Sequence, residues 1–308
     1  MPITRNSETV FKLLNGIVCV YKPAEVSLKR LCSQIKTKLC EELSQLEGRP
    51  RLANVIIKGD PSKQLSVHVE SSYSDHPAVL GPSYKQVDFR CNPVLNLGFN
   101  TSGVTLIGIN DGTKTAYYMN KNYRTRAYRI KGRFGLASDT YYKDGKFVEK
   151  STFRHIKKYN LDNLLASIQA SHQKKKFELW GVDIQSQAAY ELAVSDYVKP
   201  EITKTPLLYG IKCVEFNLPY FTIEIHSINE YEKYLHTLIH DIGMNMKSTA
   251  HCTGVQCIRH SFYTTENALL KKHWTLQNVL DNIQNNRKIY FEKTNAIQNN
   301  EQRSIAQL

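Results

Sequence analysis

The sequence predicts an α+β protein whose core is a mixed, mainly antiparallel sheet flanked by helices. Short β-branched runs are interleaved with amphipathic segments along the 308 residues, without a strict strand–helix–strand rhythm. Two of these runs flank residue 219 closely enough to form a hairpin. No stretch of about eighteen consecutive apolar residues occurs, so we expect no insertion into a membrane.

The first half of the chain is predicted to consist mainly of strands. A β-branched run at 16–21 stops at Pro23, because proline lacks the amide hydrogen that a strand ladder needs. Leu31, Ile35 and Leu39 recur at helical spacing and predict an amphipathic helix over 27–43. The remaining strand-like runs are 54–58, 65–69, 104–109 and 123–134.

The second half combines helices with the hairpin. An apolar stripe over 231–242 predicts a helix that ends at Gly243, since glycine readily adopts the backbone conformation that terminates helices. Beyond residue 285 the chain is rich in Asn and Gln, which favours one domain over 1–284 and a polar, partly disordered tail over 285–308. The other predicted elements are helices over 161–168 and 188–197 and strands over 211–216 and 221–225.

The chain as a whole is strongly basic. It contains 41 Lys and Arg against 28 Asp and Glu, for a formal net charge of +13 and a pI near 9.3. This charge favours a polyanion partner, because each basic side chain that neutralises a phosphate releases a condensed counterion. A basic protein without a polyanion partner stays the alternative. The seven cysteines are scattered and odd in number, which indicates reduced thiols in an intracellular compartment.

One segment combines basic and aromatic residues. Between Lys114 and Arg133 it carries seven basic residues, four tyrosines and no acidic residue. Alternation along a strand places Arg124, Arg126 and Tyr128 on one face, where a base could stack on the ring while the arginines hold its phosphate. The alternative is a solvated strand whose tyrosines cap the core.

A second cluster superficially suggests zinc. His251, Cys252, Cys257 and His260 lie close together in the sequence. They contain no Cys-x-x-Cys and fall in a predicted strand, so we expect no metal there.

Several short motifs follow one another in order between residues 14 and 280. They are Tyr21-Lys22-Pro23, Ser102-Gly103-Val104, Arg126-x-Tyr128, Phe134-Gly135-x-Ala137-Ser138-Asp139, Ala189-Tyr190-Glu191-Leu192-Ala193, Tyr234-Leu235-x-Thr237-Leu238 and Asp241-Ile242-Gly243. In this order and spacing they resemble the TruB family of RNA pseudouridine synthases. The resemblance extends to the animal mitochondrial branch of that family through His76-Pro77, Gly81-Pro82 and Ser171-His172-Gln173-Lys174.

The resemblance implies the TruB fold, RNA as the partner, and chemistry without a cofactor or a metal. In that family a uridine is flipped out of the RNA, an aspartate attacks it, and the freed uracil rejoins through carbon. A nearby arginine keeps that aspartate ionised. By this resemblance Tyr128 stacks on the flipped base, Tyr234 lines the same pocket and Lys22 supports the adjacent loop. Arg124 and Arg126 are expected to contact the RNA. No additional RNA-binding domain is expected.

The residues that perform the family's chemistry are missing. Gly98 occupies the position of the nucleophilic aspartate, and His236 occupies that of its arginine partner. Gln256-Cys257 stands where the family has two arginines. These losses agree with one another, because an arginine buried without its carboxylate would be an uncompensated charge. We therefore expect no intact catalytic residue.

The sequence thus predicts a family member that binds RNA, mitochondrial mRNA or rRNA, and has lost the isomerisation. Two alternatives stay open. An active synthase would need a displaced carboxylate, for which Asp88, Asp111 and Asp139 are the candidates. A non-catalytic assembly protein of mitochondrial RNA granules or ribosomes would use the fold for protein contacts. The mitochondrial location rests on the resemblance, since residues 1–15 form only a weak transit peptide.

Overall fold

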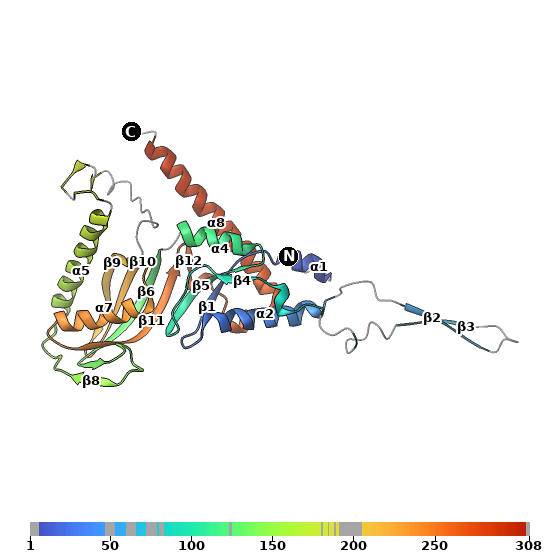
Figure 1. The fold of residues 1–308 in the computed structure, drawn as a ribbon, viewed down its shortest axis with the longest axis horizontal. Helices are drawn as coiled ribbons and strands as arrows, with labels where there is room; N and C mark the ends of the chain where they lie inside the picture. Colours follow the sequence, from blue (N-terminus) through green and yellow to red (C-terminus); the bar gives the residue numbers. More distant parts are fainter. Residues whose placement is uncertain are drawn as a thin grey trace.

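The structure is a computed structural model of the chain (Figure 1). It describes residues 6–46, 53–59, 66–71, 79, 83–122, 125–179, 181–183, 185–187, 189–190 and 205–305. Arg124 lies outside these ranges, and so does nearly all of the helix predicted over 188–197.

A sheet with the strand order β1–β5–β11–β6–β10–β9 forms the centre of the fold. Neighbouring strands in this order are antiparallel, except that β5 and β11 are parallel. The predicted mixed, mainly antiparallel sheet is therefore confirmed. The strands are β1 (Gly16–Lys22), β5 (Thr101–Ile109), β6 (Arg126–Phe134), β9 (Leu207–Asn217), β10 (Tyr220–Ile228) and β11 (Ala250–His260), with β4 (Cys91–Pro93) added at β5 and β12 (Tyr263–Thr264) at β11.

Two further strand pairs lie outside this sheet. β2 (Ala53–Lys58) pairs with β3 (Ser66–Ser71) in a hairpin that projects away from the body in Figure 1, and β7 (Leu136–Ser138) pairs with β8 (Phe147–Lys150). The described helices are α1 (Ser7–Leu13), α2 (Leu28–Ser44), α4 (Gly112–Asn122), α5 (Lys158–Leu179), α7 (Glu232–Asn245) and α8 (Leu276–Ile305).

The β1–β5 half of the sheet is covered on both faces. Val18 and Ile107 pack against α2 and α8, whereas Cys19 and Leu106 pack against α4 and Tyr263. Burial on both faces explains why these strands are continuous apolar runs rather than alternating ones.

The β6–β10–β9 half is covered on one face only. Tyr128 and Ile130 of β6 belong to a core that includes Leu235 of α7 and Leu165 of α5. Arg129, which lies between them, points to the other face and is exposed. This pattern confirms the half-exposed strand predicted over 123–134.

Two features differ from the sequence prediction. Helix α4 was not predicted, and it contains the first half of the basic, aromatic segment. Helix α7 continues past Gly243 to Asn245, so the predicted helix end was wrong. Glycine is needed at 243 for another reason, because a β-carbon there would lie 2.5 Å from the amide nitrogen of Ala250. The predicted domain boundary at 285 falls inside α8 and stays a prediction.

Candidate functional site

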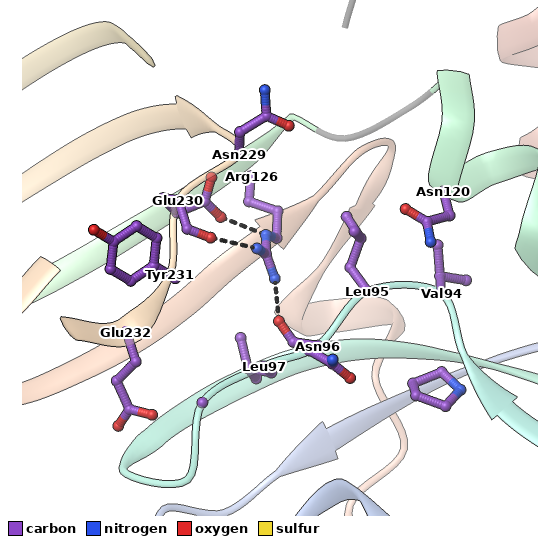
Figure 2. Close-up of a pocket in the computed structure, with 12 residues that line it drawn as sticks. Val94, Leu95, Asn96, Leu97, Asn120, Arg126, Asn229, Glu230, Tyr231 and Glu232 are labelled. Carbon is purple, nitrogen blue, oxygen red and sulfur yellow. Dashed lines mark hydrogen bonds and ion pairs between the residues drawn. The ribbon is translucent and has the colours of Figure 1, made fainter. Parts of the chain in front are cut away.

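A pocket of about 580 Å³ lies where the loop before β5 faces the loop between β10 and α7 (Figure 2). Residues 93–98 form one wall and residues 229–232 form the other, with Asn120 and Arg126 completing the lining. Its volume falls in the range of about 300–1,000 Å³ that is typical of sites for small ligands. Gly98, which the family resemblance assigns to the nucleophile position, belongs to the first wall.

Arg126 and Glu230 form a buried ion pair between these walls. Arg126 Nε lies 2.5 Å from Glu230 Oε1, and the two side chains are 6% and 0% exposed. As Figure 2 shows, Arg126 also donates to the carbonyl oxygen of Asn96 at 2.9 Å and to that of Glu230 at 3.2 Å. The guanidinium therefore connects the two loops instead of facing solvent.

Tyr128 is buried behind this ion pair. Its hydroxyl donates a hydrogen bond of 2.8 Å to Glu230 Oε1. Burial raises the pKa of Tyr128 well above its usual value, so the hydroxyl keeps its proton and remains a donor at neutral pH. The ring is buried and does not line the pocket, so its stacking on a base stays a prediction.

The segment 98–101 is held from two sides. The Nζ of Lys22 is buried and donates to the carbonyl oxygens of Phe99 at 3.0 Å and Thr101 at 2.7 Å. From the opposite side, Oε1 of Glu232 accepts the N–H of Asn100 at 2.7 Å. Burial lowers the pKa of Lys22 to about 8, although the charge of Glu232 opposes this change.

His236 and Tyr234 take different directions from α7. His236 stacks on Tyr142, and its Nε2 lies 3.9 Å from Glu232 Oε1. Burial lowers the pKa of His236 to about 4, so this side chain is neutral at pH 7 and supplies no positive charge to a carboxylate. Tyr234 points to α5, where its hydroxyl forms a hydrogen bond of 3.3 Å with His172. The pocket lining does not include Tyr234.

Basic side chains lie on the uncovered face of β6, where Arg129 and Lys131 are exposed and Arg133 is half-buried. Arg129, Lys131 and Arg133 alternate along that face, and the guanidinium of Arg133 lies 5.5 Å from the centre of the exposed ring of Tyr220. Arg129 pairs with Glu224 at 3.4 Å. Lys131 and Arg133 form no ion pair with any residue that the structure describes. We call these three side chains the open basic face.

The three aspartates considered as substitute nucleophiles lie elsewhere. Asp88 accepts the N–H of Lys85, and Asp139 accepts that of Lys146. Asp111 is exposed at the start of α4. None of the three lines the pocket.

Within the described ranges, no group of three His, Cys, Asp or Glu side chains is arranged to hold a metal ion. No helix in those ranges combines the length and the apolarity that crossing a bilayer requires.

Sequence reasoning missed Glu230 and Glu232, the two carboxylates of the pocket. Glu230 lies in the three residues between β10 and α7, and Glu232 is the first residue of α7, two positions before Tyr234. Two acidic residues at a strand–helix junction beside a recognised motif were the available signal.

Comparisons with known proteins agree on one family. Residues 96–231 match the TruB family pseudouridylate synthase N-terminal domain. The chain is 34% identical over 278 residues to the mitochondrial pseudouridylate synthase TRUB2 of Xenopus tropicalis, covering 88% of this chain and 85% of that protein. It is also 34% identical to TRUB2 of Homo sapiens, covering 88% of this chain and 83% of that protein. Among solved structures, an archaeal box H/ACA Nop10–Cbf5 complex aligns at 11% identity and a TM-score of 0.44, over 88% of this chain and 54% of that one.

Proposed function

Because the chain belongs to the TruB family of pseudouridylate synthases, we propose that it binds RNA and receives a uridine in its pocket without isomerising it. The observation that carries this proposal is Gly98, which the family resemblance assigns to the nucleophile position and which lines the pocket. Without a side chain at 98, the family's covalent step has no attacking atom there.

The two carboxylates that do line the pocket are already engaged. Glu230 is bound by Arg126 and by the hydroxyl of Tyr128. Glu232 accepts the N–H of Asn100. An attacking carboxylate must be aligned to within about 1 Å of its reaction geometry. The contacts to Arg126, Tyr128 and Asn100 hold the two carboxylates to protein groups, and we propose that neither attacks the base.

The charges around the pocket favour a base and a ribose over a phosphate. A phosphate inside the pocket would meet Glu230 and Glu232, whereas the N–H and O–H donors of a uridine would find acceptors there. We therefore assign the phosphates of the RNA to a surface outside the pocket.

The open basic face is the surface that suits those phosphates. Arg129, Lys131 and Arg133 present their charges on one uncovered sheet face, and Tyr220 adds an exposed ring on which a base can stack. This role replaces the one expected for Arg126, whose charge is neutralised by Glu230.

The names of the relatives support a mitochondrial setting. The TRUB2 proteins of Xenopus tropicalis and Homo sapiens are both named as mitochondrial, so we propose mitochondrial mRNA or rRNA as the ligand.

Salt-dependent RNA binding tests the proposal. Each basic side chain that contacts a phosphate contributes about 1 to the slope of log K against log salt. Changing Arg129, Lys131 and Arg133 together to glutamine is expected to weaken binding and to reduce that slope by about 2 to 3.

The matched control removes the same charge elsewhere. Lys12, Lys38 and Lys174 are exposed on α1, α2 and α5, and their change to glutamine is expected to leave the slope nearly unaltered. An equal effect of both triple variants would show that net charge alone attracts RNA. RNA binding without salt dependence would favour the alternative of an assembly protein that works through protein contacts.

A further inference from the structure

The first residue of helix α7, Glu232, lies directly beside Gly98. The direction in which a side chain would leave Gly98 is occupied by Glu232, whose carboxylate lies where the β-carbon would stand. The β-carbon of Glu232 is itself only 2.6 Å from that position. Real β-carbons do not approach other atoms so closely, so rotating the carboxylate away would not make room for a side chain at 98.

This contact also fixes the wall of the pocket. Glu232 accepts the N–H of Asn100, while Lys22 donates to the carbonyl oxygens of the two residues that flank it. Farther along the same wall, Arg126 holds the carbonyl oxygen of Asn96. The loop from 96 to 101 is therefore attached at both ends by charged side chains from other elements.

We infer that Glu232 is a positioning residue that takes the place of the side chain absent from Gly98 and holds the pocket in the shape that receives a uridine. Gly98 and Glu232 are a matched pair, because Glu232 in this position leaves room only for glycine at 98. The inference rests on the proposed function for its ligand but not for the contact itself. It predicts that restoring an aspartate at 98 alone does not restore the family's active site, because Glu232 already fills that space.

The surroundings of Glu232 fit a structural acceptor better than a nucleophile. Burial raises the pKa of Glu232, although the N–H groups of Asn100 and Phe99 and the charge of Lys22 oppose this change. His236, one helical turn away, is neutral at pH 7 because burial lowers its pKa to about 4. The family's arginine would have stabilised an ionised carboxylate here, and this chain has none in its place.

A thermal double-mutant cycle tests the matched pair. Gly98→Ala alone is expected to lower the melting temperature by roughly 5 °C, because its methyl group collides with Glu232. Combining it with Glu232→Gly is expected to lose less than the sum of the two single losses, since the glycine opens the space. Gly254→Ala is the control, because nothing lies within 4 Å of its β-carbon position. Additive losses would overturn the pairing.

RNA affinity tests the positioning role. Glu232→Ala leaves the N–H of Asn100 without its acceptor and is expected to weaken binding of a uridine-containing stem–loop about tenfold. Glu232→Gln keeps an acceptor of the same reach and is expected to stay within about twofold of the unaltered protein. Equal affinity of Glu232→Ala and the unaltered protein would overturn the inference.

Two further results separate this inference from the proposed function. If the unaltered protein binds no RNA, the proposed function fails, while the thermal cycle still decides whether Glu232 and Gly98 are coupled. If tritium is released from [5-³H]uridine RNA and Glu232→Gln abolishes the release, Glu232 is a nucleophile and the positioning role is wrong.

Discussion

Replacing Glu230 with glutamine is expected to destabilise the fold strongly. The substitution keeps the size of the side chain and one oxygen acceptor for the hydroxyl of Tyr128, so it removes little except charge. Arg126 then remains charged beside a neutral amide, with its side chain only 6% exposed. The substitution thus removes the negative charge of a buried ion pair with little change in shape.

The expected loss is about 3–5 kcal/mol in the free energy of unfolding, which is the usual cost of leaving one buried charge without its partner. Two carbonyl oxygens, those of Asn96 and Glu230, still accept from Arg126, which favours the lower end of this range. Removing both charges with Arg126→Met and Glu230→Gln is expected to recover most of the loss, since a buried pair replaced by neutral groups is often close to neutral.

Equilibrium unfolding in urea measures these values, with the slope against urea confirming that the same transition is compared. Glu224→Gln is the matched control, because Glu224 pairs with Arg129 at 3.4 Å where the arginine side chain is 44% exposed. Partly exposed pairs contribute about 0–1 kcal/mol. The reasoning is refuted if Glu230→Gln costs no more than Glu224→Gln, or if the double variant loses the sum of both single losses.

Two further predictions concern titration and the loop. Burial lowers the pKa of His236 to about 4 and that of His260 to about 3, so protonation favours the unfolded chain. The stability that the neutral histidines contribute is therefore fully present above about pH 6.5 and is lost as the pH falls from there through their folded-state pKa values. Between pH 7 and pH 4, the urea midpoint of His236→Asn should fall less than that of the unaltered protein. An unchanged fall in that variant would contradict the assignment. Lys22→Met leaves the carbonyl oxygens of Phe99 and Thr101 without a donor, so we expect a loss of about 1–3 kcal/mol and weaker RNA binding. Unaltered stability would show that the loop holds its shape without Lys22.

Local patterns were sufficient for much of the fold. The β-branched run at 16–21 and the helical spacing of Leu31, Ile35 and Leu39 each depend on neighbours in the sequence, and both elements are present as predicted. Helix α4 was missed because it has few apolar residues at helical spacing, and of its eleven residues only Gly112, Ala116 and Met119 are buried. Its register is set by packing on β1 and β5, which no local pattern reveals.

Alternation along β6 was also predicted, but it could not show which face is buried. Both faces carry arginines, and the tyrosine ring beside Arg126, together with the family resemblance, favoured the face with Arg126 and Tyr128. That face is buried against α5 and α7, where Arg126 is neutralised by Glu230, a partner 104 residues away in the chain. Arg129 and Lys131 are left as the exposed basic residues.

The missing side chain at 98 was visible in the sequence, whereas its replacement was not. Glu232 reaches the loop across 132 residues, measured from its hydrogen bond with Asn100. Such a contact depends on how α7 packs against the sheet, so no spacing of residues within a single sequence reveals it.

Single-turnover tritium release from [5-³H]uridine RNA tests the central claim most directly. The RNA is a mitochondrial transcript pool from the same source, mixed with an excess of protein at a salt concentration at which binding is saturated. Isomerisation replaces the hydrogen on carbon 5 of the base, so each turnover releases one tritium to water. If Gly98 stands at the nucleophile position as proposed, RNA is expected to bind while release stays at the level of a protein-free blank. Release that depends on the protein and approaches one tritium per bound RNA would contradict the account.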